Sequence, residues 1–161
     1  MATVEKFEDL IAWQRARELV KFIYDISKSR NFAADKGLVN QIRRASVSVM
    51  SNIAEGFDRA TQNEFIDALF IAKGEAGEVR SQLYIAYDCR YIDISKFQSG
   101  LKLTDECSRL IQSFAQKVKV GARRGLQFKH IKKPAGFEAD FDKQGLVRLP
   151  DGRFVSKNKG L

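Results

Sequence analysis

The sequence has few of the residues on which enzyme and metal chemistry usually depend. It contains one histidine, two cysteines and two prolines among 161 residues. His130 stands beside lysines, without a partner that would orient it as a general base, so we expect an exposed tail residue. Cys89 and Cys107 have no metal-type spacing, and we expect both to be reduced, small core residues.

The short motifs of catalytic and cofactor sites are also missing. The chain has no Walker loop, dinucleotide-type glycine fingerprint, His-Glu-x-x-His or Cys-x-x-Cys. Glu75 and Glu78 could pair as acid groups, but solvated charges on a helix are the simpler interpretation. We therefore expect no enzyme, no catalytic residue, no metal and no cofactor. An enzyme would need an unrecognised site between subunits, which a metal or cofactor bound to purified protein would reveal.

Long apolar runs are absent as well. No stretch approaches 18 apolar residues, and the N-terminus lacks a basic segment followed by an apolar one. We expect no membrane span, no signal peptide and a cytoplasmic protein.

Helical periodicity fills the part of the chain that precedes both prolines. Segments 9–29, 35–58, 61 to at least 86, and 95–120 repeat apolar residues at helical spacing. Asp9 and Asp35 are expected N-caps, Thr61 to Glu64 has the form of a capping box, and Gly121 is the expected stop. Short connections predict an all-α, antiparallel up-down-up-down four-helix bundle over 1–120, followed by a basic extension over 121–161.

Segment 35–58 has an apolar arc of roughly 200°, about twice the width of one core-facing stripe. We interpret the excess as surface buried against another subunit. Gly74 and Gly77 share a ridge with Ile66, Phe70 and Tyr84 and suggest a close helix–helix approach, since each costs about 1 kcal/mol relative to alanine. The expected oligomer interface is Arg43, Val47, Met50, Phe57, Gly74 and Gly77.

A polar strip runs along the same segment, at Arg44, Ser48, Ser51, Asn52 and Glu55. One interpretation is a buried hydrogen-bond network that fixes the register of helices or subunits. The other is a recognition face for phosphate or base edges led by Arg44. A structural role is favoured for Glu55, because a carboxylate repels phosphate.

Positive charge is concentrated in the extension. Residues 1–120 contain 18 Lys and Arg against 16 Asp and Glu, whereas residues 121–161 contain 10 against 4. A polyanion, most simply nucleic acid, is one expected partner; a solvated, solubilising tail is the alternative. The expected phosphate-binding residues are Arg123, Arg124, Lys129, Lys132 and Lys133, with Arg44 as a further candidate. Residues 146–155 carry Pro-Asp-Gly between two apolar runs, which predicts a β-hairpin.

Several blocks of sequence match one known pattern. They are Phe7 to Trp13 with Ala16 and Leu19, Gln41 to Ala45 with Ser48, Asn52 to Gly56 with Arg59, and Leu69, Ala72, Glu78 and Leu83. Over residues 7–118 the chain resembles the four-helix-bundle proteins encoded in intervening sequences of bacterial 23S rRNA genes. It departs from them at Glu75, where a small serine is usual, and in the length of its basic tail.

The resemblance implies an antiparallel four-helix bundle that assembles into a ring-shaped homopentamer without established enzymatic activity. It also points to the accessory proteins of diversity-generating retroelements, which bind nucleic acid and associate with a reverse transcriptase. Our first hypothesis is a non-enzymatic, homo-oligomeric nucleic-acid-binding protein that contacts RNA or DNA. The second is a retroelement accessory scaffold, in which the hairpin and the tail aromatics grip a reverse transcriptase.

Overall fold

The computed structural model describes residues 4–59, 61–123, 146–148 and 154–156. The chain divides into two compact units, Met1–Phe128 and Lys129–Leu161.

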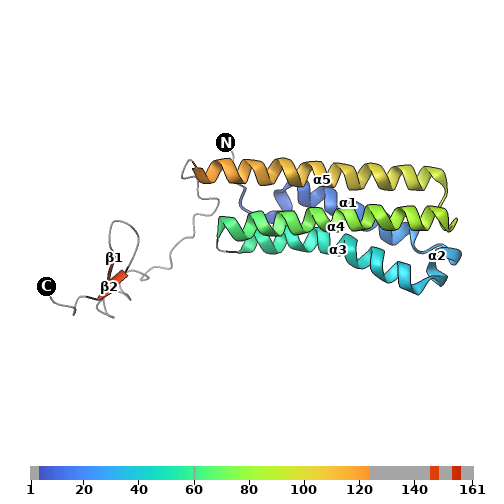
Figure 1. Cartoon of the computed structure of the whole chain (residues 1–161), viewed down its shortest axis with the longest axis horizontal. Helices are drawn as coiled ribbons and strands as arrows, with labels where there is room; N and C mark the ends of the chain where they lie inside the picture. Colours follow the sequence, from blue (N-terminus) through green and yellow to red (C-terminus); the bar gives the residue numbers. More distant parts are fainter. Residues whose placement is uncertain (1–3, 60, 124–145, 149–153, 157–161) are drawn as a thin grey trace. The chain divides into compact units, whose positions relative to one another are not determined.

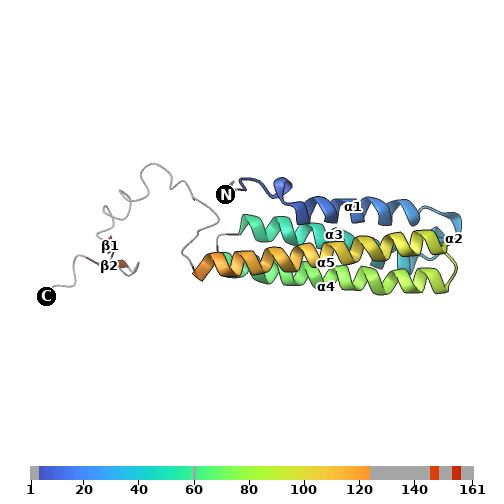
Figure 2. The ribbon, with the colours of Figure 1, turned by 90° about the horizontal axis from the view of Figure 1, so that it is seen from above.

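The first unit is an all-α bundle. Its elements are the 3-10 helix η1 (Phe7–Asp9) and the helices α1 (Ile11–Ile26), α2 (Arg30–Ala34), α3 (Lys36–Asp58), α4 (Gln62–Asp88) and α5 (Ile94–Arg123). The four long helices lie side by side and alternate in direction, while α2 sits at one end between α1 and α3 (Figures 1 and 2). Both α3 and α5 pack against α1 and against α4, so α1 and α4 occupy diagonal corners. The predicted up-down-up-down bundle is confirmed.

Side-chain caps fix two of the predicted helix starts. Asp35 Oδ1 accepts a hydrogen bond from the backbone N–H of Leu38 at 3.0 Å, as predicted. Thr61 Oγ1 accepts from the backbone N–H of Glu64 at 3.3 Å, and its hydroxyl donates to the Glu64 carboxylate at 2.6 Å. The second bond holds the pKa of Glu64 below its ordinary value. Both of these predicted starts are confirmed.

Three predicted boundaries are wrong. Asp9 lies in η1, and α1 begins after Leu10 without a side-chain cap. The predicted turn after residue 29 contains the short helix α2. Gly121 does not end the last helix, because α5 continues through it to Arg123.

The predicted 4-3 seams form the core. On α4, every seam position from Phe65 to Ala86 is buried. On α5, Phe97, Thr104, Ile111, Ala115 and Val118 are buried, together with Cys107. Side chains three and four residues apart stack on one helix face, which is why a spacing pattern can predict burial.

The close helix–helix approach lies at Gly56 of α3, not at the glycines of α4. A Cβ atom at Gly56 would stand 2.5 Å from Ala68 Cβ and 3.0 Å from Phe65 Cδ2. Within the chain, a Cβ at Gly74 or Gly77 would meet nothing within 4 Å. The glycine that brings α3 and α4 together is therefore Gly56.

Replacing Gly56 by Ala is expected to lower the free energy of unfolding by about 1–3 kcal/mol. Ala68 has no rotamer through which it could move away from the added methyl group, so the two helices would have to separate. Chemical denaturation measures the change. Gly37→Ala is the matched control, because its Cβ would make only an ordinary 3.5 Å contact with Asp35 Oδ1. Equal stability of the two variants would contradict the close approach.

The second unit contains one antiparallel strand pair in its described residues. β1 (Leu146–Arg148) pairs with β2 (Phe154–Ser156), and Val147 lies opposite Val155. The predicted pairing of the two apolar runs is therefore confirmed, and the Pro-Asp-Gly segment between them lies outside the described residues.

Candidate functional site

The apolar ridges of α3 are covered by the chain itself. Val49 and Ile53 are fully buried, and Phe57 is only 6% exposed, with its ring edge-on to Phe65 at 5.8 Å between centroids. Met50 is partly buried and packs against the core. The chain's own helices therefore hide most of the apolar surface of α3, and only part of the predicted excess remains, at Val47, Met50 and Ala54, which are partly exposed.

Arg43 joins α3 to α1 within the chain. Its Nε donates to Ser27 Oγ at 2.8 Å, and its guanidinium lies 4.8 Å from the centroid of the Tyr24 ring. Val47, one turn further along α3, remains partly exposed. Of the residues expected at an interface on α3, Phe57 is thus buried in the core, while Arg43 and Val47 lie at the edge of the contact between α1 and α3.

The surplus apolar surface lies on α4 instead. Phe70 is 43% exposed, Ile71 54%, and Tyr84 and Ile85 46% each. On a helix of 3.6 residues per turn these side chains flank Gly74, Gly77 and Ser81 on the side opposite the buried seam. We call these seven residues the α4 stripe.

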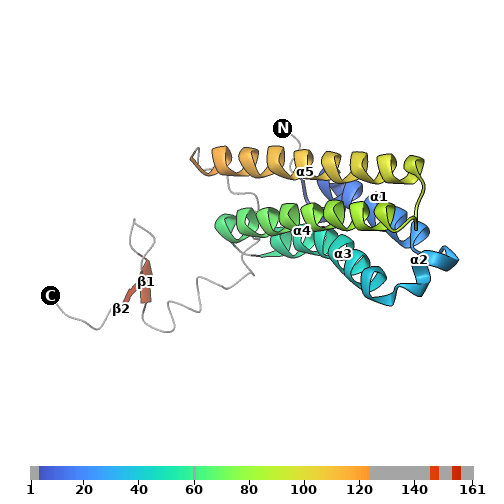
Figure 3. The same cartoon turned by 45° about the vertical axis from the view of Figure 1, so that its right-hand side comes forward.

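The α4 stripe gives α4 a second apolar side, which no other described element covers. Leu69, Ala76 and Leu83 already fill the inward face, so α4 is apolar on two sides. Near one end, the Tyr84 ring meets Phe97 of α5 edge-on at 5.0 Å between centroids. This end of α4 lies beside the start of α5 (Figure 3). The sequence had marked Phe70, Gly74, Gly77 and Tyr84 as one ridge but had missed Ile71 and Ile85.

The polar strip on α3 does not form a buried network. Asn52 Nδ2 donates to Ser48 O at 2.8 Å and to Ser48 Oγ at 3.1 Å, and this is the one pair the strip makes within itself in the described part of the chain. Arg44, Ser51 and Glu55 are exposed. Glu55 forms an ion pair with Arg59, which raises the pKa of that guanidinium.

Among the described residues, three other polar side chains are buried, and of these only Thr104 belongs to a predicted seam. Ser27, Ser46 and Thr104 each donate to a backbone carbonyl three residues earlier, at 3.2, 2.8 and 2.9 Å respectively. Such local bonds satisfy the hydroxyl proton without a distant acceptor, so they leave no spacing signal in the sequence.

Of the expected phosphate-binding residues, Arg44 is exposed on the outer face of α3. Arg124, Lys129, Lys132 and Lys133 lie outside the described residues, and Arg123 is the last residue of α5. Their role stays a prediction.

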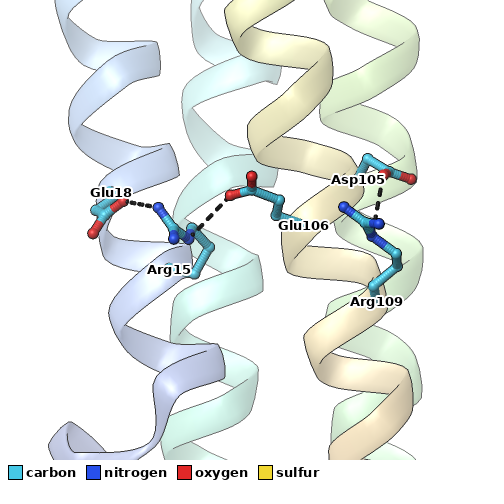
Figure 4. A network of polar contacts seen from close by, with 5 residues as sticks. All are labelled: Arg15, Glu18, Asp105, Glu106 and Arg109. Atoms are coloured by element: carbon cyan, nitrogen blue, oxygen red, sulfur yellow. Dashed lines mark hydrogen bonds and ion pairs between the residues drawn. The ribbon is translucent and has the colours of Figure 1, made fainter.

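Charges between α1 and α5 are largely paired. Arg15 binds Glu18 of its own helix and reaches Glu106 Oε2 of α5 at 3.3 Å (Figure 4). Arg109 holds Asp105 at 3.2 Å one turn away on α5. This flank of the bundle is therefore close to neutral.

The two cysteines differ in environment, contrary to the expectation that both lie in the core. Cys89 follows α4 and is exposed, whereas Cys107 is buried. Burial raises the pKa of the Cys107 thiol to about 12. The expected core position is therefore confirmed for Cys107 and wrong for Cys89.

A thiol reagent at pH 8 is expected to modify one cysteine per native chain and two after denaturation. The thiolate is the reactive form, and a pKa of about 12 leaves Cys107 protonated at that pH. Absorbance titration with a disulfide reagent counts the reacting groups. In Cys89→Ser no native thiol should react, and fast modification of that variant would contradict the burial of Cys107.

The described ranges contain neither a cluster of metal-ligating side chains nor a helix of membrane-spanning character. Within residues 4–59, 61–123 and the two strands, no three His, Cys, Asp or Glu side chains come together as a metal site would require. None of the described helices combines the length and apolarity of a membrane span.

Sequence comparison identifies the family. Residues 8–113 match the 23S rRNA-intervening sequence proteins. The chain belongs to this family. The match begins in η1 and ends within α5, so it includes α1, α3 and α4 in full and the first two thirds of α5.

A solved structure has the same fold. It is the crystal structure of a protein with unknown function from the S23 ribosomal protein family of Bacteroides thetaiotaomicron VPI-5482. The two chains are 24% identical and superpose with a TM-score of 0.62 over 65% of this chain and 98% of the other. No curated protein shows detectable similarity to the sequence.

Proposed function

We propose that this member of the 23S rRNA-intervening sequence protein family is a non-enzymatic, cytoplasmic homo-oligomer that binds RNA or DNA through phosphate contacts. The α4 stripe supports the assembly. The uneven charge of the chain supports the nucleic acid. The number of subunits, five, is taken from the family resemblance.

The argument for assembly begins with the exposed surface of α4. Four large apolar side chains lie on one exposed helix face, around two glycines with open space above them. Large apolar side chains that are exposed along one helix face commonly mark a protein–protein contact. Glycine inside a helix costs stability, and close backbone approach of a second helix is a reason for it to be present.

The argument for nucleic acid rests on where the positive charge lies. Residues 121–161 carry 10 Lys and Arg against 4 Asp and Glu, so every copy adds a strongly basic segment. An oligomer would bring several such segments together, and many weak Lys and Arg contacts then act on one polyanion. Such binding is strongly salt-dependent and weakly sequence-specific.

Two measurements on the intact chain test this function. Light scattering at micromolar concentration is expected to give a multiple of the 18.3 kDa chain mass. Binding of labelled single-stranded RNA is expected to weaken steeply between about 50 and 200 mM salt. A single-chain mass would refute the assembly. An affinity for RNA that does not change with salt concentration would refute the phosphate contacts.

A second function is an accessory scaffold for a reverse transcriptase, in which the strand pair and the aromatic residues of the extension contact that enzyme. Co-purification of a reverse transcriptase with the full chain, but not with residues 1–120, would favour this function. Retention of the enzyme by residues 1–120 alone would contradict it.

A further inference from the structure

Three acidic side chains lie beside the seven residues of the α4 stripe and carry unpaired negative charge. Asp67, Glu78 and Asp88 project from the same exposed side of α4 as Gly74, and all three are exposed. None of the three has an ion pair within the described part of the chain. The surface that a partner must cover is therefore both apolar and acidic.

A second surface, on the diagonally opposite corner of the bundle, has the complementary character. On the outside of α1, Val20 is partly exposed and Tyr24 is 40% exposed. The neighbouring Arg17 and Lys21 are exposed, and neither has an ion pair in the described residues.

The adjoining edge of α3 continues this surface. Val47 and Ala54 are partly exposed there, and Arg43 ties the edge to the Tyr24 ring. We call this surface, made of Arg17, Val20, Lys21, Tyr24, Arg43, Val47 and Ala54, the α1–α3 face.

The two exposed acids of α1 lie at or beyond the edge of the α1–α3 face. Glu18 is bound by Arg15, which also reaches Glu106 of α5, so it lies on the α5 side of the helix (Figure 4). Asp25 lies one turn after Lys21, at the edge of the face, and pairs with Lys28 at 3.9 Å. Inside this edge the α1–α3 face presents basic and apolar groups.

We propose that the acidic α4 stripe of one copy packs against the basic α1–α3 face of the next. This inference rests on the proposed homo-oligomer and names its two contacting surfaces. Opposite charges at the rim fix the orientation, and the glycines allow a second backbone close to α4. Because the two surfaces differ, each copy uses both, and the contact is heterologous: it repeats into a ring where the rotation between copies closes and into a filament where it does not. An α4–α4 pair would instead bring the three acids of each copy toward those of the other.

Charge reversal in the full chain distinguishes these arrangements. Arg17→Glu/Lys21→Glu reverses the α1–α3 face, and Asp67→Lys/Glu78→Lys reverses the α4 stripe. Each double variant is expected to weaken the assembly roughly tenfold or more, because like charges then meet at the contact. The variant with all four changes is expected to regain most of the lost affinity. Light scattering over a concentration series measures assembly, and circular dichroism confirms that each variant is helical.

Lys96→Glu/Lys102→Glu is the matched control, since it makes the same change of charge on exposed positions of α5. It is expected to assemble as the unchanged protein does. Wild-type assembly in the Arg17→Glu/Lys21→Glu variant, or no recovery in the fourfold variant, would overturn the pairing while leaving the oligomer in place. A monomeric unchanged protein would overturn the proposed function itself.

Discussion

Replacing Ile85 by Lys is expected to reduce the protein in solution to the mass of one 18.3 kDa chain. Ile85 is 46% exposed in the single chain and lies on the α4 stripe, beside Ser81 and Gly77. In the proposed assembly this side chain is buried, and an unpaired ammonium placed there would lose its hydration. In the isolated chain the same lysine would extend into water, so the fold should persist.

Ile11→Lys is the control for this prediction. Ile11 is 67% exposed at the start of α1, so the substitution removes an isoleucine and adds a charge without touching the α4 stripe. Sedimentation should show the oligomer for Ile11→Lys and the single chain for Ile85→Lys, with equal helix content by circular dichroism. The same mass for both variants would remove α4 from the interface.

The positions that could be predicted from the sequence are those set by local geometry. Asp35 and Thr61 cap helices because a short side-chain oxygen reaches a backbone N–H three residues on. Leu69 and Val79 are buried because their spacing places them on one face of α4. Such relations connect residues that are only a few positions apart, so the amino-acid sequence alone is enough to predict them.

The sequence could not show which helix keeps an apolar face exposed to solvent. On a wheel, α3 has the wider apolar arc, yet α1 and α4 pack on it from two sides and bury Ile53 and Phe57. For α4, which packs against α3 and α5, Phe70 and Ile71 stay exposed. Cover depends on how the whole bundle is arranged, and periodicity within one helix does not contain that information.

The glycines illustrate the same limit. Gly56, Gly74 and Gly77 all lie inside helices. Spacing alone favoured Gly74 and Gly77 as the points where a second helix comes close. The side chains around Gly56 come from the facing helix α4, at Phe65 and Ala68. Only the packing of two helices distinguishes a glycine required inside the fold from one left open on its surface.

Neutralising four basic residues of the C-terminal extension is expected to have the largest effect on nucleic-acid binding. The variant carries Gln at Arg124, Lys129, Lys132 and Lys133. Each lost phosphate contact reduces the release of counterions, so the slope of log affinity against log salt should fall by about 3 for a single strand. At 0.1 M salt this corresponds to a loss on the order of 10²- to 10³-fold in affinity. Fluorescence anisotropy with labelled RNA over a salt series gives both quantities.

The matched control removes the same number of charges from the bundle, with Gln at Lys96, Lys102, Lys117 and Lys119, all exposed on α5. If net charge alone attracted the polyanion, the two variants would lose affinity equally, because each chain changes by four charges. If the extension makes the contacts, the control keeps its slope, since long-range attraction is screened beyond about 10 Å at 0.1 M salt. Equal slopes in both variants would therefore reject the extension as the phosphate-binding segment. Adding Arg44→Gln to the extension variant then tests the bundle's own candidate. A further drop of about 0.7 in the slope is expected if that side chain contacts one more phosphate.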